Sequence, residues 1–386
     1  MIPVSGSVQN IEIGPRMAGM NRYLVGGAVR DELLGRPVTD RDYLVTGVDE
    51  GTFLSRFPGA KRVGRRAFVY IVDGHEYTIS SDADVMQDLM RRDLTINAMA
   101  KDGNGRLIAH PRALADLQEG VLRPVAAVNF VADPLRLFRA ARFAAEFPEF
   151  KPHATLSAIC RKLAAEGLIS TPAAERVGHE VLKACAAPRP SRFLNRLADW
   201  NALVPWLTEL QEARSIPAGP APYHNESLFL HTVRVMDALR GCPLTAWMGL
   251  CHDLGKAATP RRRWPQHHGH GTAGAALAEE LGQRLKLPSR YVRAGIAAAR
   301  WHMTTGRYPE LRAGTKVRLL LNLHRLNLIT PMAHLVQADQ HGDHQECMES
   351  DLKKLLEIHL PSAKRNLGAA SANHLHHLRC QALARS

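Results

Sequence analysis

The stretch LVGGAVRDELLGRPVTDRDYLV, residues 24–45, decides the fold. An apolar run, two glycines, a helix-like segment and a second apolar run follow one another, which is the order of a strand, a turn, a helix and a strand. Asp40 and Asp42 stand one residue apart just before the second run. Side chains alternate between the two faces of a strand, so both carboxylates point the same way. The stretch predicts an α/β domain with an acidic site at the mouth of a strand.

This acidic pair suits a particular chemistry. Two carboxylates on one face repel each other unless cations bind between them, and Mg²⁺ prefers such oxygen ligands together with substrate phosphates. Two metal ions about 4 Å apart suit in-line phosphoryl or nucleotidyl transfer. A solvated turn explains the same pair without any function, because Asp is common before strands. Upstream, Gly27 lets backbone N–H groups approach a phosphate, and Arg30 can add a charge-assisted hydrogen bond, which favours the functional interpretation.

Composition narrows the class of protein. The chain has 386 residues and 45% hydrophobic content, enough for two or three domains with buried cores. Its formal net charge of +13 makes a polyanionic partner plausible. No apolar run reaches the length of a membrane helix, and the first twenty residues lack the regions of a signal peptide. The six cysteines are scattered, without a C-x-x-C pair. We therefore expect a cytoplasmic protein with reduced thiols and no membrane partner.

Patterns along the chain predict six parts. Short apolar runs alternate with helix-like segments in the first third, and helical spacing dominates afterwards. The predicted parts are an N-terminal extension at 1–20, an α/β head at 21–130, a helical neck or body at 131–214, a Pro/Gly-rich linker at 215–225, a second helical block at 226–342 and an irregular tail at 343–386.

The segment DPLRLFRAARFAAEF, residues 133–147, carries three arginines at intervals of three. Arg136, Arg139 and Arg142 therefore share a helix face that would be costly to bury without anions. A forked guanidinium beside the carboxylate of Asp133 can match the donors and acceptors of a base edge. A solvated basic helix face explains the pattern equally well.

Four segments together resemble one family. They are LVGGAVRDELLG at 24–35, DRDYLV at 40–45, RRDLTINAMA at 91–100 and DPLRLFRAARFAAEF at 133–147. In this order they resemble the class II tRNA nucleotidyltransferases, which build or repair the 3′ CCA end of tRNA from CTP and ATP without a template. The resemblance implies a polymerase β-like α/β head, an all-α neck and body with an RNA-binding surface, and tRNA as partner. Bacterial poly(A) polymerases share the head and neck and remain an alternative.

The resemblance also implies roles for individual residues. Asp40 and Asp42 would be the catalytic pair that carries Mg²⁺, and Asp133 and Arg136 would read the Watson–Crick edge of CTP or ATP. Asp93 and Asn97 would help to shape the ribose pocket. The nucleotide-binding residues would be Gly27, Arg30, Arg92, Asp133, Arg136, Arg139 and Arg142.

The chain departs from the family pattern in the head. Ala132 stands where a Glu usually precedes the neck Asp, and the strand through Glu76 is followed by a short connection, 81–90, in place of a flexible loop. The stretch 109–117 lacks the Asp and glycines usual there. These departures predict slower or lost A addition. They also motivate a second hypothesis, in which the head is a degenerate RNA-binding module.

Histidines cluster in the second helical block. A lone His on a helix is more often a core or surface residue than a ligand, but an adjacent His252-Asp253 pair flanked by His231 and Asp339 indicates a site for a divalent transition metal such as Ni²⁺ or Mn²⁺. Such a metal lowers the pKa of bound water. The cluster also contains further histidines without an assigned role: His267, His268, His270 and His302.

The pattern of His231, His252, Asp253 and Asp339 resembles the H…HD…D signature of the HD phosphohydrolase superfamily. One branch of the tRNA nucleotidyltransferases has an HD domain after the neck. This resemblance implies an all-α HD domain with phosphatase and 2′,3′-cyclic phosphodiesterase activities, and it implies that Lys256 contacts phosphate. A nucleotide-signalling enzyme is a further alternative, and the chain is expected to be a monomer or a homodimer.

Overall fold

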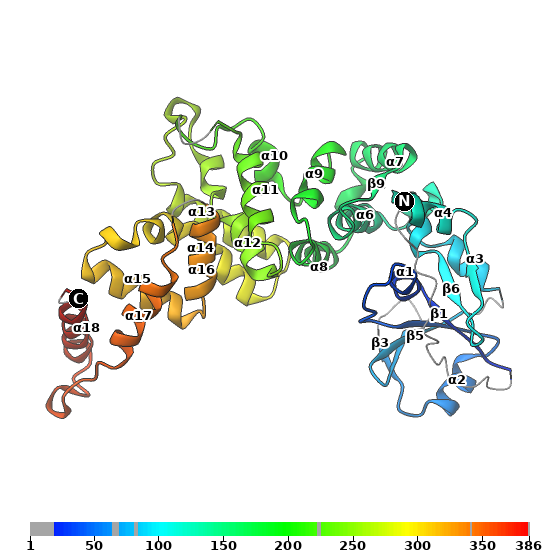
Figure 1. The fold of residues 1–386 in the computed structure, drawn as a ribbon, viewed down its shortest axis with the longest axis horizontal. Coiled ribbons are helices and arrows are strands. Elements are labelled where there is room, and N and C mark those ends of the chain that lie inside the picture. Colours follow the sequence, from blue (N-terminus) through cyan, green and yellow to red (C-terminus); the bar gives the residue numbers. More distant parts are fainter. Residues whose placement is uncertain (1–18, 64–68, 81–83, 222–224, 340–341, 385–386) are drawn as a thin grey trace. The chain divides into compact units, whose positions relative to one another are not determined.

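The computed structural model describes residues 19–63, 69–80, 84–221, 225–339 and 342–384. The predicted extension at 1–20 lies almost wholly outside the described residues, and so do 81–83 of the short connection in the head. The chain forms two compact units, residues 1–171 and 172–386 (Figure 1).

The first unit is built on a mixed sheet. Among the described residues it has seven strands in the order β3-β4-β5-β2-β1-β6-β7, and only β2 and β5 run parallel to each other. The strands are β1 Asn21–Val25, β2 Asp42–Thr46, β3 Lys61–Val63, β4 Val69–Val72, β5 His75–Ile79, β6 Met99–Lys101 and β7 Leu107–Ala109.

Strand β2 lies in the middle of this sheet because the residues that follow Asp42, from Tyr43 to Val45, are apolar. Residues 43–46 are buried, and the Tyr43 ring stacks on Tyr77 of β5 with centroids 4.9 Å apart. In the register of the sheet, Asp42 pairs with Val25 of β1 on one side and with Glu76 of β5 on the other. The start of β2 therefore lies beside the end of β1.

Helices complete the first unit. Helix α1 begins at the Gly26 turn, where φ is +73°, a backbone conformation that favours glycine. Helix α6 buries most of its apolar side chains, including Phe138 and Ala141. The helices are α1 Gly27–Leu33, α2 Glu50–Arg56, α3 Val85–Met90, α4 Ala113–Glu119, α5 Ala127–Ala132, α6 Leu135–Glu146 and α7 Ala154–Ala165.

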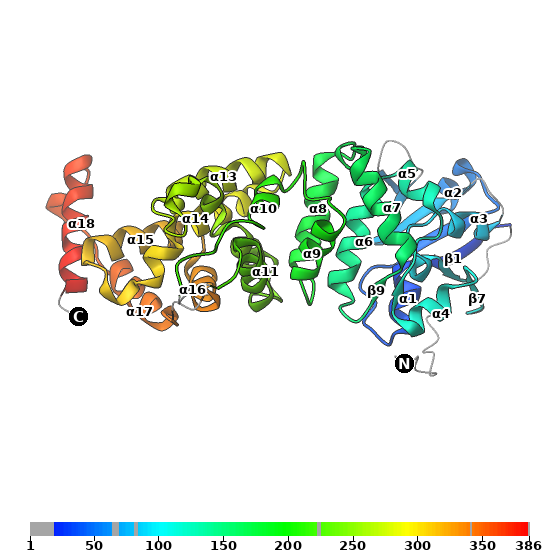
Figure 2. The same ribbon diagram turned by 90° about the horizontal axis from the view of Figure 1, so that it is seen from above.

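In the described residues of the second unit, the regular secondary structure is helical apart from a β-bridge between Pro217 and Ser227. Helices α13 and α14 pack side by side (Figure 2), and α14 also contacts α12 and α16. The helices are α8 Ala174–Cys185, α9 Ser191–Asp199, α10 Thr208–Glu212, α11 Leu228–Ala238, α12 Pro243–Cys251, α13 His270–Arg284, α14 Ser289–Gly306, α15 Ala313–Arg325, α16 Ile329–Ala338, α17 Gln345–Leu356 and α18 Ala369–Ala384. In the part of the chain that the structure describes, no helix has both the length and the apolar character to cross a membrane.

The structure corrects the prediction of an irregular tail at 343–386. Helices α17 and α18 occupy most of it. Met348 and Leu355 of α17 are buried in a core that includes Leu320 of α15 and Leu335 of α16. Charged residues surround the few apolar positions of α17, so the sequence alone does not predict this helix. Its apolar face is identified by the residues of α15 and α16 that it contacts.

The predicted linker at 215–225 also differs from expectation. Ile216 and Ala218 are buried, and their backbones exchange hydrogen bonds with the start of the next helix: Ala218 N donates to Glu226 O at 3.0 Å and Leu228 N donates to Ile216 O at 2.7 Å. Residues on both sides of this segment belong to the second unit, and the two units divide at 171/172, inside the predicted neck.

One close approach in the second unit positions residues of the histidine cluster. Gly255, in the 3₁₀ turn η3 Leu254–Ala258, packs against the start of α13. A Cβ atom at Gly255 would lie 1.9 Å from His270 O and 2.5 Å from Gly274 N. Both obstacles are backbone atoms, so a larger residue would push the turn after Asp253 away from His270.

Gly255→Ala is therefore expected to lower the free energy of unfolding of the second unit by at least about 1–3 kcal/mol, the usual cost of overpacking. All five tryptophans follow residue 171, so tryptophan fluorescence during urea unfolding reports on this unit. Gly314→Ala, in α15 of the same unit, is the matched control, because a Cβ there meets only Cys380 Sγ at 3.8 Å, an ordinary van der Waals contact. An unchanged unfolding midpoint for Gly255→Ala would contradict the close packing of η3 on α13.

Candidate functional site

The predicted catalytic aspartates lie at the start of β2. Asp40 and Asp42 are both exposed, and Asp42 is the first residue of the strand. Glu76 is the register partner of Asp42 on the neighbouring parallel strand, so a third carboxylate lies beside the pair. Exposed carboxylate oxygens from adjacent strand positions are the donor set that Mg²⁺ accepts.

The Gly26-Gly27 turn lies next to these aspartates and under Arg92. A Cβ atom at Gly26 would come within 2.5 Å of Arg92 Nη1, so a side chain at this position would collide with the arginine. The Arg92 guanidinium is oriented by Asp88, whose Oδ2 accepts from Nε at 3.0 Å and from Nη2 at 2.9 Å. The structure therefore brings the first and third of the four sequence segments together.

Arg30 is buried, at 4% exposure, and its guanidinium is already bonded. Its Nη1 donates to Asn97 Oδ1 at 2.6 Å and its Nη2 donates to Asp31 Oδ2 at 3.0 Å. Glu146 Oε1 lies 3.5 Å from the same Nη2, and the Phe147 ring lies below the guanidinium. The charge of Arg30 is thus held inside the unit by two carboxylates and an amide.

Asp93 is a buried carboxylate that links the third and fourth segments. Its Oδ1 accepts from Leu94 N at 2.8 Å and Asn97 Nδ2 at 3.0 Å, and its Oδ2 accepts from Arg139 Nε at 2.7 Å. Burial alone would raise the pKa of Asp93, but Arg139 and the three hydrogen bonds together lower the pKa below its ordinary value. Asp93 is therefore ionised in the folded chain.

The three arginines of α6 have different surroundings, although the sequence predicts one shared face. Arg136 is half-buried and its Nη1 donates to Arg91 O at 2.5 Å. Arg139 is 34% exposed and pairs with Asp93, whereas Arg142 is buried and pairs with Glu146. Asp133 precedes α6, where its Oδ1 accepts from Leu135 N at 3.3 Å. The predicted nucleotide residues are thus joined by ion pairs and hydrogen bonds.

The four residues of the H…HD…D pattern meet in the second unit. His231 comes from α11, His252 and Asp253 from the end of α12, and Asp339 from the end of α16. His231 Nε2 lies 2.9 Å from Asp339 Oδ1, 3.1 Å from His252 Nε2 and 3.5 Å from Asp253 Oδ2. All four side chains are at least nine-tenths buried. Such a set of imidazole and carboxylate ligands suits a divalent transition metal.

Two histidines that the sequence leaves unassigned join this cluster. His270, the first residue of α13, and His302 of α14 each place Nε2 3.4 Å from Asp253 Oδ1. Burial is the main cause that lowers the pKa of His270 to about 4. Both residues lie in the histidine-rich stretches of the sequence, but spacing alone does not indicate which of those histidines converge.

Lys256 and His267 have structural partners in the same region. Lys256 is buried, and its Nζ donates to Asp253 Oδ2 at 2.6 Å and to Ala218 O at 2.7 Å. His267 Nε2 lies 2.9 Å from Pro217 O. These contacts of Lys256 and His267 hold the segment 217–218 against the cluster.

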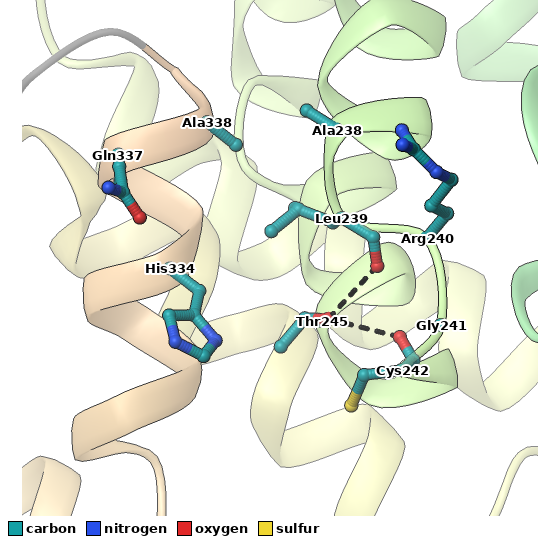
Figure 3. Close-up of a pocket in the computed structure, with 9 residues that line it drawn as sticks. All are labelled: Ala238, Leu239, Arg240, Gly241, Cys242, Thr245, His334, Gln337 and Ala338. Carbon is teal, nitrogen blue, oxygen red and sulfur yellow. Dashed lines mark hydrogen bonds between the residues drawn. The ribbon is translucent and has the colours of Figure 1, made fainter.

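A pocket of about 520 Å³ lies elsewhere in the second unit, between α16 and the connection from α11 to α12. Figure 3 shows His334 and Gln337 on the α16 side of the pocket and Thr245 on the other side, where Thr245 donates to Leu239 O and Cys242 O. The lining residues include no carboxylate, and none of them belongs to the predicted sites. The lining of this pocket therefore differs from that of both predicted sites, although Ala338 directly precedes Asp339.

Comparisons with known proteins agree with this organisation. The model of the Poly A polymerase head domain family matches residues 63–123, and the model of the HD domain family matches residues 228–336. The first match lies in the unit that holds Asp42 and Asp93, and the second contains five of the six residues of the histidine cluster, all but Asp339.

Curated relatives span most of the chain. A multifunctional CCA protein of Herminiimonas arsenicoxydans is 38% identical over 324 residues, which cover 78% of this chain and 77% of the relative. A multifunctional CCA protein of Xylella fastidiosa is 35% identical over 390 residues, which cover 92% of this chain and 93% of the relative.

Solved structures share the fold. The CCA-adding enzyme of Bacillus stearothermophilus in complex with CTP has a TM-score of 0.64 at 21% identity, covering 95% of this chain and 93% of that chain. The CCA-adding enzyme of Thermotoga maritima complexed with tRNA has a TM-score of 0.55 at 19% identity, and the match covers 94% of this chain and 87% of that chain.

The buried charge of Asp93 predicts a pH dependence in the first unit. Its pKa in the folded chain lies below the unfolded value of about 3.9, so its ionisation contributes stability above about pH 4 that is lost as the pH falls below this value. Hydrogen exchange of residues 91–100, corrected for intrinsic rates, should show an opening free energy that decreases from pH 5 to pH 3. Asp93→Asn should reduce this slope, whereas exchange in a variant of the exposed Glu119, Glu119→Gln, should follow the parent. Equal slopes for Asp93→Asn and the parent would contradict the assignment.

Proposed function

The chain belongs to the family of multifunctional CCA proteins, and from this premise we propose that it adds or repairs the 3′-terminal CCA of tRNA with CTP and ATP, and that its HD domain hydrolyses phosphate esters. The observation that carries the proposal is the 38% identity to a multifunctional CCA protein over 78% of the chain. The geometry of both units supports it, because each unit holds the donor set that one of the two reactions needs.

In the first reaction the tRNA 3′-hydroxyl attacks the α-phosphorus of CTP or ATP, and pyrophosphate leaves. Asp40 and Asp42, with Glu76 beside them, would hold Mg²⁺ in this reaction. Bound Mg²⁺ activates the attacking hydroxyl and neutralises the leaving pyrophosphate. The surplus of positive charge over the whole chain supports tRNA and triphosphates as partners.

The nucleotide-binding residues divide into two groups. Gly27, at the N-terminus of α1, and Arg92, which lies over the Gly26-Gly27 turn, would contact the triphosphate. Asp133 and Arg136 would read the edge of the base.

The other arginines would act by positioning. Arg30, Arg139 and Arg142 pair with the carboxylates of Asp31, Asp93 and Glu146 respectively, so their charges are compensated inside the protein. We assign them to the pocket as residues that fix its shape. In this assignment Asp93 and Asn97 define the ribose side of the pocket.

In the second reaction the HD domain would hydrolyse phosphate monoesters and 2′,3′-cyclic phosphates. His231, His252, Asp253 and Asp339 would hold a divalent transition metal such as Ni²⁺ or Mn²⁺, and a bound metal of this kind lowers the pKa of water. Lys256 and His252 keep Asp253 ionised, since they lower its pKa although burial raises it. A cytoplasmic location is part of the proposal, supported by the six free cysteines.

The transfer reaction is tested with tRNA that lacks its CCA end. The parent should add two C residues from CTP and then one A from ATP, the A more slowly, as the departures from the family pattern in the head predict. Asp42→Asn should lower the rate by about 10²- to 10⁴-fold, because the loss of a metal ligand removes several kcal/mol of transition-state stabilisation. Hydrolysis by the HD domain is the internal control and should be unchanged in Asp42→Asn. Unlimited A addition without C addition by the parent would contradict CCA addition and favour a poly(A) polymerase.

The hydrolytic reaction is tested with the reciprocal variant. His252→Ala should abolish release of product from a nucleoside 2′,3′-cyclic phosphate in the presence of Mn²⁺, because it removes an imidazole from the centre of the cluster. The same variant should extend tRNA at the parental rate. A parent that hydrolyses the cyclic phosphate but never extends tRNA would indicate a degenerate head, and retained hydrolysis in His252→Ala would contradict the proposed site.

A further inference from the structure

We propose that the exposed arginines Arg261, Arg262 and Arg263 form an RNA-binding surface beside the histidine cluster. Through this surface the HD domain would select the phosphate end of an RNA strand over a free mononucleotide. The inference deepens the proposed phosphohydrolase function and rests on it for the hydrolytic step. The three arginines are not part of the H…HD…D pattern, and none of the sites described above contains them.

The arginine segment concentrates positive charge that the protein does not compensate. Between Asp253 and Glu279 the sequence has no Asp or Glu. The three arginines form the 3₁₀ turn η4 Arg261–Arg263, and all three are exposed. In the part of the chain that the structure describes, no carboxylate pairs with any of them, and Arg261 instead lies over the Trp264 ring at 6.0 Å. Three adjacent guanidinium groups without a carboxylate partner repel one another, so this turn favours a polyanionic partner.

Hydrogen bonds hold this segment against the cluster. Lys256 N donates to the main-chain oxygen of Asp253 at 2.9 Å, and Thr259 N donates to Lys256 O at 3.1 Å. Trp264 Nε1 donates to Thr259 O at 3.0 Å and so closes the arginine turn. Lys256 and Thr259 are buried, whereas the arginines between Thr259 and Trp264 are exposed. The arginines therefore project into solvent from a segment that is fixed to the turn after Asp253.

The other end of the segment leads to the most exposed residue of the cluster. His267 follows Arg263 by four positions, and four extended residues span at most about 14 Å. His267 O accepts from His270 N at 3.2 Å. The side chain of His270 is 12% exposed, whereas the other five side chains of the cluster are at most 5% exposed. Among the described residues, solvent thus reaches the cluster on the His270 side, to which the arginine turn is joined.

The chemistry of the arginine turn fits a nucleic-acid strand better than a single nucleotide. Guanidinium groups bind phosphate through paired charge-assisted hydrogen bonds. A nucleoside 2′,3′-cyclic phosphate has one phosphate, and the cluster would hold it during hydrolysis. An RNA strand whose terminal phosphate lies at the cluster has further phosphates upstream, which can reach the three arginines. Contacts of this kind go to the backbone and do not depend on the base sequence.

The arginines would affect binding of the substrate and leave the chemical step unchanged. In that step water attacks the phosphorus of the terminal 2′,3′-cyclic phosphate and one of its two bonds to ribose oxygen breaks. A proton of the water passes to the freed ribose oxygen, which leaves a phosphate monoester. The upstream phosphates do not change during this step. Interactions that are equally strong in the bound substrate and in the transition state lower KM without changing kcat.

The test compares two substrates of the full-length chain in the presence of Mn²⁺. One is a short single-stranded RNA that ends in a 2′,3′-cyclic phosphate, and the other is a nucleoside 2′,3′-cyclic phosphate. The triple variant Arg261→Gln, Arg262→Gln and Arg263→Gln should raise KM for the RNA about tenfold or more at low salt and leave KM for the nucleoside unchanged. Each phosphate contact on a single strand contributes about 0.7 to the slope of log KM against log salt concentration, so the RNA slope should fall by about 2.

Two control variants separate local phosphate contacts from the loss of net charge. The matched control removes three other exposed arginines of the second unit, by Arg312→Gln, Arg318→Gln and Arg325→Gln in and directly before α15. It should leave both KM values unchanged. The triple variant with lysine at 261–263 should keep most of the preference for RNA, because each lysine still neutralises a phosphate. Circular dichroism of all three variants should match that of the parent, since the replaced side chains are exposed.

An unchanged KM for the RNA in the glutamine variant at 261–263 would overturn the proposal. An equal rise in KM for both substrates would also overturn it, because the arginines would then contact only the reacting phosphate.

Hydrogen exchange of residues 257–268 with a short RNA that ends in a 3′-phosphate separates the surface from the hydrolytic function. Protection in the parent that is lost in the glutamine variant would support the surface, and it would do so even if neither substrate is hydrolysed, a result that would reject the function alone. Hydrolysis without protection would reject the surface and leave the function intact. Binding to vesicles of anionic lipid without protection by RNA would indicate a membrane-binding surface and overturn the proposal.

Discussion

The ion pair between Asp93 and Arg139 is the interaction on which the head depends. Burying several arginines in one unit costs free energy unless anions accompany them. Asp93 compensates Arg139, while Glu146 lies beside both Arg30 and Arg142. Because these charges are already paired, the segments around the Gly26-Gly27 turn, Asn97 and α6 are held together before any nucleotide binds. The energetic cost of ordering the pocket is thus met during folding.

In the second unit, backbone contacts rather than ion pairs hold the side chains of the histidine cluster in place. Backbone carbonyls orient the rings of three histidines, and two glycines, Gly255 and Gly274, let the turn after Asp253 pack tightly on α13. Contacts of Lys256 with Ala218 O and of His267 with Pro217 O fix the segment 217–218 against the same cluster. Hydrogen bonds and close backbone packing from the described residues therefore restrain the side chains of the cluster. Rigid ligands suit metal binding because little conformational entropy is lost when the ion arrives.

Local patterns in the sequence predict a large part of this structure. The order of strand, glycine turn, helix and strand at 24–45 appears as β1, α1 and β2, and the H…HD…D residues meet as expected. Long-range contacts account for what sequence patterns miss. The sequence places Arg30 in the first turn of a helix, but its burial against Glu146 depends on a residue more than a hundred positions away. Helix α17 and the packing of 215–221 likewise depend on partners elsewhere in the chain, and the choice of His270 and His302 over His268 depends on how α13 and α14 pack.

A crystal structure of the full chain with CTP and Mg²⁺ tests this arrangement of the head most directly. We expect a cation on Asp40 and Asp42, the triphosphate at Gly27 and Arg92, and the base edge facing Asp133 and Arg136. We also expect the Asp93–Arg139 pair to keep its 2.7 Å contact. A nucleotide bound away from the start of β2, or an Arg139 that leaves Asp93 to contact the nucleotide, would contradict this arrangement.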